Sequence, residues 1–417
     1  MQAPDVVTTA VATQAKNGRR MASLDGLRGI AALSIFIFHG WLYTMPEPAA
    51  SNRSTIGDYA VHELRLGLVL FFALSGFLLS RPWFAAALEE RRPPDLGNYL
   101  RARVARIAPA YYVALIGSIG LLWGLSGTPG LRLPPAGELP LFFVFAQNTS
   151  PASVMKLNPP MWSLAVEVSF YALLPLIGWL AVRLPARRRM QALLPLALLA
   201  LGILWNWWIA GQGLGLTFSK TLAAMLPYFA VGMLAALWLH GRTPGAVTRR
   251  AMTAGGLGLV LADATIKAAA PAVGVDTGSF FVILRDLPSA LGFALIIAAA
   301  ASMTRSRILG SRVLAGMGVI SYGFYLWHVP VLVFLRGHGL LPLDPLLGTV
   351  VALVPSVAVA ALSWFALERP VIAWAARRNE RAREERRTRE RASSRETSGG
   401  GGADRRAGGR EVGTLRA

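Results

Sequence analysis

The sequence lacks cysteine and is poor in charged residues. The absence of cysteine from all 417 residues excludes disulfide bonds, thiolate metal sites and a cysteine nucleophile. Only 15% of the residues are charged, compared with roughly 25% in a typical soluble domain. Hydrophobic residues make up 54% of the chain, and the mean hydropathy is +0.47. This composition excludes a disordered protein and argues against a soluble globular enzyme.

The basic residues lie between apolar runs and in one terminal tail. The formal net charge is +20, and 13 of the 42 Lys and Arg residues lie between Arg377 and the end of the sequence. Most of the others form short clusters between long apolar runs, which is typical of multi-span membrane proteins. We therefore expect a lipid bilayer, and no nucleic acid, as the surface that this chain contacts.

Ten apolar runs are long enough to cross a membrane as helices. They cover approximately residues 27–43, 64–80, 108–126, 161–182, 191–210, 219–240, 252–270, 285–303, 313–335 and 346–368. A further run, 139–146, is too short to span. The sequence thus predicts an all-α polytopic membrane protein with about ten transmembrane helices.

Alternate loops differ in their basic content. With the N-terminus placed inside, the inner segments carry 19 Lys and Arg residues and the outer loops carry 8. Because basic loops stay in the cytoplasm, both termini are predicted to be cytoplasmic, in a multi-pass protein of the cell (cytoplasmic) membrane. We divide the chain into a disordered cytoplasmic leader (1–20), a membrane domain (21–376) and a basic cytoplasmic tail (377–417), rich in Arg and Glu and then in Gly.

Three ionisable residues lie inside separate predicted spans. A charge at the bilayer centre costs about 2.5–3.5 kcal/mol, so such a residue needs a partner or a function. His39, Glu167 and His328 all fall in the predicted outer half of the membrane. Their similar depth predicts one polar site within the bundle. A function is favoured for Glu167, whereas function and packing are equally open for the two histidines.

Further polar residues share a helical face with Glu167 or His328, at spacings of three, four or seven residues. These candidates are Ser163, Tyr171, Ser321 and Tyr325. Such side chains also serve as packing contacts between membrane helices, and packing is favoured for Ser321. Asp263 and Lys267 are predicted to neutralise each other at i and i+4, and Asn206 is predicted to be structural.

Three arginines are candidate phosphate-binding residues. Arg28 precedes His39 by eleven residues, which places both on one face of a helix and roughly 16 Å apart. Arg103 and Arg106 are three residues apart, and two forked guanidinium groups on one face suit a multiply charged phosphate ligand. Ordinary positive-inside charge is the alternative, and spacing alone favours it. No Walker loop, zinc-protease motif or nucleophile elbow is present, and we expect neither a metal nor a permanently bound cofactor.

Six tracts occur in the order in which a known membrane enzyme family carries them. They are LDGLRGIAALSIFIFH (24–39), VLFFALSGFLL (69–79), RARVARIAPAYY (101–112), MWSLAVEVSFYALLPL (161–176), ISYGFYLWHVPVL (320–332) and ERP (368–370). Together they resemble the acyltransferase 3 family of integral-membrane O-acyltransferases. The resemblance implies transfer of an acyl group, typically acetyl, from acyl-CoA as co-substrate. The acceptor would be a hydroxyl of a sugar, glycolipid, polysaccharide or macrolide-type molecule.

The resemblance also implies roles for individual residues. Arg28 and His39 match the family's arginine-x10-histidine motif, and Arg103 and Arg106 match its arginine-x-x-arginine motif. His39 is then the expected base, because histidine titrates near neutrality. Glu167 is expected to orient that base or to hold imidazolium charge. The three arginines would bind coenzyme A.

Several matters stay open at this point. Relatives often carry a second acidic residue after the glutamate, and Val168 stands there in this chain. The alternative function is a membrane transporter or exporter that uses the intramembrane His and Glu as a proton relay. Neither the acceptor nor the acyl chain length can be read from these residues, nor whether the acyl group passes through His39 covalently.

Overall fold

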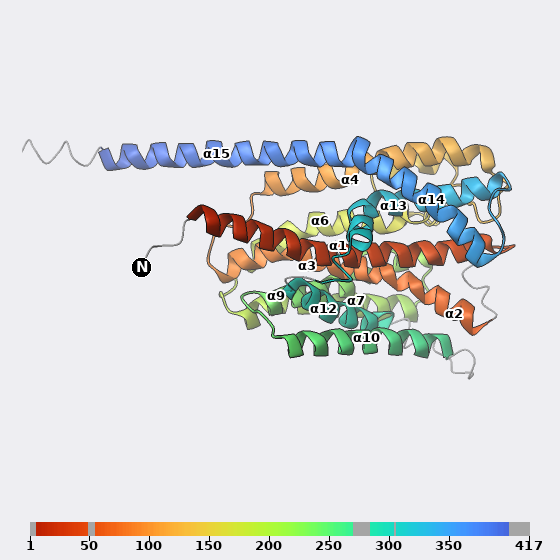
Figure 1. Cartoon of the computed structure of the whole chain (residues 1–417), viewed down its shortest axis with the longest axis horizontal. Coiled ribbons are helices and arrows are strands. Elements are labelled where there is room, and N and C mark those ends of the chain that lie inside the picture. The colour runs from red at the N-terminus through yellow and green to blue at the C-terminus, as the bar shows by residue number, and fades with distance from the viewer. Residues whose placement is uncertain (1–5, 49–54, 270–283, 304–305, 400–417) are drawn as a thin grey trace, which may run out of the picture.

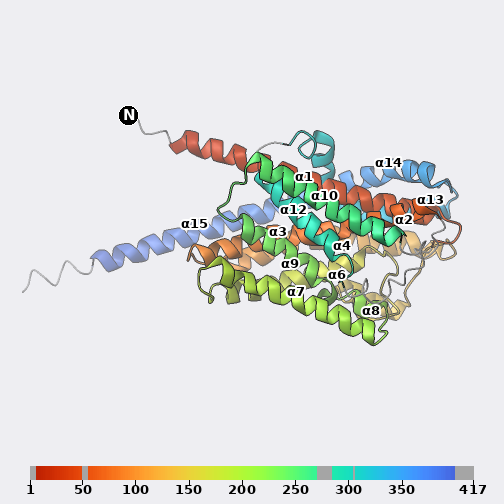
Figure 2. The ribbon, with the colours of Figure 1, turned by 90° about the horizontal axis from the view of Figure 1, so that it is seen from below.

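The computed structural model describes residues 6–48, 55–269, 284–303 and 306–399, and all regular structure within these ranges is helical. The helices form one bundle, in which the long ones run side by side (Figures 1 and 2). They are α1 (Val6–Thr44), α2 (Ile56–His62), α3 (Gly67–Leu88), α4 (Leu96–Leu122), α5 (Leu139–Phe143), α6 (Met161–Ala181), α7 (Arg188–Gly211), α8 (Leu216–Ser219), α9 (Leu222–Leu239), α10 (Ala246–Ala269), α12 (Leu287–Ser302), α13 (Arg312–Gly337), α14 (Pro345–Ser363) and α15 (Arg369–Gly399).

Every predicted span coincides with one of these helices. Within the described ranges, eight helical segments are long and apolar enough to cross a membrane. The other two are α12, which has only 16 residues, and α10, which has 24 residues but includes two arginines, an aspartate and a lysine. The short run at 139–146 forms the five-residue helix α5. The chain is thus an all-α polytopic membrane protein.

Two helices extend past the predicted spans at one end of the bundle. Helix α1 begins at Val6, so residues 6–20, which the sequence analysis assigns to a disordered leader, lie on this helix. A π-helical turn (Trp364–Glu368) joins α14 to α15, which continues to Gly399. We name this the α15 end of the bundle, and the opposite end, where α2 lies, the α2 end (Figure 1).

Glycines bring α3 and α9 into backbone contact. A Cβ atom on Gly76 would lie 2.2 Å from the carbonyl oxygen of Phe229, and one on Gly232 would lie 2.0 Å from that of Ala73. Membrane helices use small residues for such close approach because no hydrophobic force drives them together in lipid. The contact fixes α3, which supplies side chains to each of the cavities described below.

A similar contact joins α1 to α13. A Cβ atom on Gly318 would lie 1.8 Å from the carbonyl oxygen of Asp25. Ser311 caps the start of α13 by accepting a hydrogen bond from the Leu314 N–H at 3.3 Å. Because the two helices then run together toward the α2 end, residues near the end of α1 face the second half of α13.

Candidate active site

Three cavities lie in a row between the two ends of the bundle. The basic cavity opens at the α15 end, has a volume of about 1200 Å³ and is lined by Arg28, Arg81, Arg103 and Arg106 among others. The central cavity, of about 100 Å³, shares three of these arginines and two leucines with it. The histidine cavity, of about 250 Å³, contains His39. Leu68, Phe72 and Tyr325 line both the central and the histidine cavity.

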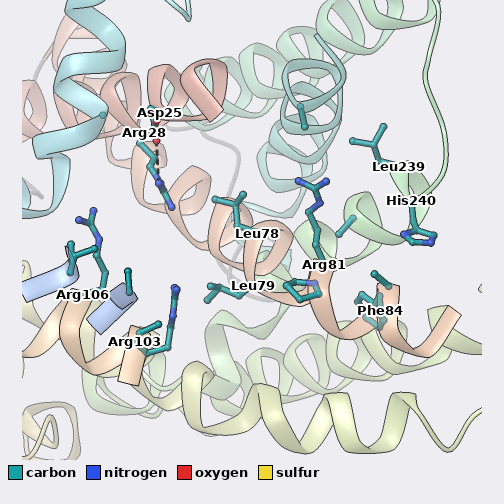
Figure 3. A pocket seen from close by; sticks show the side chains of 18 of the residues that line it. Asp25, Arg28, Leu78, Leu79, Arg81, Phe84, Arg103, Arg106, Leu239 and His240 are labelled. Atoms are coloured by element: carbon teal, nitrogen blue, oxygen red, sulfur yellow. Dashed lines mark hydrogen bonds and ion pairs between the residues drawn. The ribbon is translucent and has the colours of Figure 1, made fainter. Parts of the chain in front are cut away.

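Arginines from three helices, α1, α3 and α4, line the basic cavity. Figure 3 shows Arg28 of α1 and Arg103 of α4 extending toward each other from opposite walls. Arg28 pairs with Asp25 at 3.3 Å, and Arg106 approaches Glu368 at 3.5 Å. These carboxylates hold two of the guanidinium groups in place. The arrangement gathers positive charge from segments that are distant in the sequence.

Arg103 differs from these two arginines in its partners. Its guanidinium lies over the rings of Tyr99 and Tyr171, 6.0 and 5.8 Å from their centres. Its Nε is buried without a hydrogen-bond partner, and no described carboxylate forms an ion pair with it. A buried donor that lacks an acceptor is costly, so Arg103 is the arginine best placed to gain from a bound anion.

Glu167 lies in the central cavity. Its Oε1 accepts hydrogen bonds from the Ser75 hydroxyl at 2.8 Å and from the Tyr171 hydroxyl at 2.7 Å. Its Oε2 accepts none from the described residues and belongs to a side chain that lines the cavity. The carboxylate therefore keeps one oxygen for a donor on a bound molecule, close to the arginines that share this cavity.

The two predicted histidines form a pair at the α2 side of the row. His328 Nε2 lies 3.0 Å from His39 Nδ1, and His328 Nδ1 lies 3.1 Å from the carbonyl oxygen of Phe324. A carbonyl only accepts, so the neutral His328 carries its proton on Nδ1 and accepts on Nε2. His39 must then donate from Nδ1, which leaves the lone pair on its Nε2. His328 is only 1% exposed, whereas His39 lines the cavity.

The structure brings the histidines together but does not add Glu167 to them. Among the described residues, Glu167 has no hydrogen bond to His39 or to His328. The expectation that Glu167 orients His39 is therefore not met, and His328 makes that contact. The reason is the rotation of α6 about its axis, which equal depth in the membrane does not reveal. This helix turns Glu167 toward Ser75 of α3.

Ser163 and Tyr325 meet where the central and histidine cavities adjoin. Their hydroxyl oxygens are 2.7 Å apart, and both hydroxyls lie within hydrogen-bond distance of the Pro160 carbonyl oxygen, at 3.0 and 3.1 Å. Ser321 donates to the Gly318 carbonyl within its own helix at 2.8 Å. Tyr325 thus lines both cavities, and Ser321 lines the central cavity.

The residues predicted to be structural have structural contacts. Lys267 pairs with Asp263 at 2.8 Å and also reaches Asp286 at 2.7 Å. Asn206 donates to the Ala224 carbonyl at 3.2 Å. Asp263, Lys267 and Asn206 line none of the three cavities, whereas Asp286 lines the histidine cavity.

A family comparison agrees with the order of the tracts. The model of an acyltransferase domain matches residues 21–365. The chain belongs to the acyltransferase 3 family. All three cavities are lined mainly by residues inside this match, so the site described here is part of the family's domain.

Curated relatives of this family are distant. O-acetyltransferase OatA of Staphylococcus aureus is 24% identical over 370 residues, which cover 85% of this chain and 57% of OatA. The chain therefore spans little more than half of that relative. Nodulation protein 10 of Rhizobium leguminosarum bv. viciae is 26% identical over 84% of this chain and 93% of its own length. Acyltransferase MdmB of Streptomyces mycarofaciens is 29% identical over 40% of this chain and 42% of its own. No solved structure matches the chain.

Three site residues are not among the candidates derived from the sequence. Ser75 bonds to Glu167, Glu368 holds Arg106, and Lys220 lines the histidine cavity. Ser75 and Glu368 lie within family tracts, but a serine in an apolar helix has no charge to mark it, and Glu368 is the last residue of the final predicted span. Lys220 counts only as a loop charge in the sequence, because its position beside the cavity depends on tertiary packing.

Proposed function

We propose that this acyltransferase moves an acyl group, acetyl in the simplest case, from acyl-CoA to a hydroxyl group. The acceptor class is a sugar, glycolipid, polysaccharide or macrolide-type molecule. The observation that carries the proposal is the row of adjoining cavities with arginines at one end and the lone pair of His39 near the other. A long donor with an anionic head and a reactive thioester at its far end suits that arrangement.

The basic cavity would hold the phosphates of coenzyme A. Guanidinium groups form strong, directional hydrogen bonds to phosphate, and Arg103 has a buried donor without a partner. The excess of basic residues in the predicted inner loops assigns the α15 end to the cytoplasm, where acyl-CoA is made. The volume of this cavity leaves room for the nucleotide part of the donor.

The central cavity would hold the pantetheine arm. This arm is a narrow chain with two amide N–H groups, and the cavity is correspondingly small. Oε2 of Glu167 takes no hydrogen bond from the described residues, so it can accept one from such an amide. In this proposal Glu167 binds the donor and does not orient the base.

His39 would act as the general base. Its Nε2 takes the proton of the acceptor hydroxyl as that oxygen attacks the thioester carbonyl carbon. His328 Nε2, which accepts from His39 Nδ1 at 3.0 Å, holds the ring in the required tautomer and stabilises the imidazolium that forms. When the tetrahedral intermediate collapses, the carbon–sulfur bond breaks, and His39 returns the proton to the coenzyme A thiolate.

The purified protein in liposomes, with acetyl-CoA added, tests this function. Release of free coenzyme A thiol should require both the donor and a hydroxyl acceptor, and the acceptor should gain one acetyl group by mass spectrometry. Vectorial movement of substrate with no acyl-CoA present would instead support the transporter. A comparison of glycolipids, polysaccharide and secreted metabolites from a deletion strain would identify the natural acceptor by its missing acyl increment.

A further inference from the structure

The histidine cavity contains cations as well as the proposed base. Its walls include Arg65, Lys220, Arg285 and a single carboxylate, that of Asp286. Because this cavity also contains His39, whatever binds here lies beside the proposed site of acyl transfer. Cations that lack a carboxylate partner would attract an acidic acceptor to this site.

The carboxylates near this cavity form ion pairs with Arg65 and Lys267. Asp286 accepts from Arg65 at 2.9 and 3.0 Å and from Lys267 at 2.7 Å. Glu63 contacts Arg65 at 3.1 Å, and Asp263 contacts Lys267 at 2.8 Å. Among the described residues, these three carboxylates contact the two cations Arg65 and Lys267, and Glu63 also contacts His62 at 3.1 Å. The carboxylates exceed those two cations by one negative charge.

Lys220 and Arg285 have no carboxylate partner among the described residues. The Nζ of Lys220 lies 4.1 Å from the centre of the Trp162 ring and makes no hydrogen bond within the described part of the chain. Arg285 donates to the Ser219 carbonyl at 3.1 Å. A cation–π contact compensates part of the cost of burying an ammonium group but occupies none of its three N–H donors.

The backbone of Arg285 adds a second observation. Its φ is +47°, in the left-handed region that residues other than glycine rarely adopt. Such conformations persist only where surrounding contacts hold them, and they cluster at ligand sites. Here the conformation belongs to an arginine that lines the cavity and directly precedes Asp286 in the sequence.

We propose that Lys220 and Arg285 form an anion-binding subsite for the acceptor. A carboxylate or phosphate on the acceptor would bind between these cations and leave a neighbouring hydroxyl within reach of His39. Trp162 and Tyr228, which line the same cavity, add aromatic surface beside these cations. The proposal rests on the proposed function and narrows its acceptor to hydroxyl compounds that carry an acidic group.

The test uses the full chain in phosphatidylcholine nanodiscs with acetyl-CoA as donor. Glucose, glucuronic acid and glucose 6-phosphate serve as soluble acceptors that differ in charge. Discs that contain phosphatidylglycerol, which has headgroup hydroxyls beside a phosphate, test a lipid as the source of the anion. We expect kcat/KM for at least one acidic acceptor to exceed that for glucose by about tenfold, which corresponds to about 1.4 kcal/mol.

Substitution of the cation should remove this preference. In Lys220→Gln the ratio of acidic to neutral acceptor should fall to about one, whereas Lys156→Gln should keep it. Lys156 is a matched control because it lies in the segment that leads to α6 but does not line the cavity. Equal use of glucose and every acidic acceptor, or an equal loss for all acceptors in Lys220→Gln, would overturn the subsite.

Saturation-transfer NMR separates this subsite from the proposed chemistry, because it detects binding without turnover. Binding of glucose 6-phosphate, but not glucose, that is lost in Lys220→Gln would support the subsite even where no acetyl group is transferred. In that case acyl transfer to these sugars, and not the anion site, is the part that fails. Absence of both charge-dependent binding and charge-dependent transfer contradicts the subsite.

Discussion

His328 Nε2 accepts a hydrogen bond from His39 Nδ1 across 3.0 Å, and this contact joins helices α1 and α13 at the candidate base. The residues are separated by 289 positions. Because Nδ1 of His328 donates to the Phe324 carbonyl, the network fixes which nitrogen of His39 keeps its lone pair. The direction of the hydrogen bonds therefore assigns the base more specifically than residue identity does.

The first prediction concerns the base itself. Glutamine in place of His39 cannot take a proton in the transition state, so His39→Gln should lower kcat for thiol release by about 100-fold or more. The measurement is free coenzyme A thiol from acetyl-CoA and an active acceptor. His338→Gln is the matched control, because His338 is exposed at the end of α13 and lines none of the three cavities. Full activity of purified His39→Gln would remove the assigned base.

The second prediction separates positioning from binding. His328→Phe keeps a ring of similar size but removes the acceptor for His39 Nδ1, so kcat should fall by about 10–100-fold, a loss typical for removal of a residue that orients a functional group. KM for acyl-CoA should stay within about twofold. His328→Gln supplies an amide oxygen and should recover part of the activity. A role in packing alone would predict the opposite order, with the phenylalanine variant the more active.

The third prediction concerns the phosphates of the donor. Arg103→Gln removes charge-assisted hydrogen bonds of about 1.5–3 kcal/mol, so KM for acetyl-CoA should rise by about 10–150-fold while kcat changes little. Acetyl-pantetheine lacks the nucleotide, and its KM should not respond to the substitution. Arg183→Gln is the control, since Arg183 at the end of α6 contacts Trp179 and lines none of the three cavities. Equal losses with both donors would argue against phosphate binding by Arg103.

The fourth prediction tests the contact that holds α3. A valine at Gly232 would place its Cβ 2.0 Å from the Ala73 carbonyl oxygen, and overpacking of this kind costs about 1–3 kcal/mol. Gly232→Val should therefore lower the thermal unfolding midpoint in detergent. Gly258→Val in α10 is the control, because a Cβ there meets no atom within 4 Å. Equal midpoints for the two variants would show that α3 and α9 tolerate separation.

The sequence predicts the helices well because each apolar run is long and its period is helical. It also places Arg28 and His39 on one face of α1, since that relation lies within one helix. Relations between helices depend on rotation and on close contacts such as that between Gly318 and Asp25. For this reason equal depth placed the three residues near one another, but it could not show that His39 contacts His328 while Glu167 contacts Ser75 and Tyr171 in the adjoining cavity.

The last prediction concerns how much of the C-terminal tail the enzyme needs. Asn379 of α15 accepts a hydrogen bond from Arg101 at 2.5 Å, donates to the Asn98 carbonyl at 3.1 Å and lines the basic cavity. Removal of residues 377–417 would therefore break contacts of the catalytic domain. A chain that ends at Glu385 keeps these contacts, so it should retain its rate of thiol release within about twofold. A twofold change corresponds to less than about 0.5 kcal/mol in activation free energy. If the chain that ends at Glu385 loses activity while a chain that ends at Gly399 keeps it, residues 386–399 have a role in the reaction.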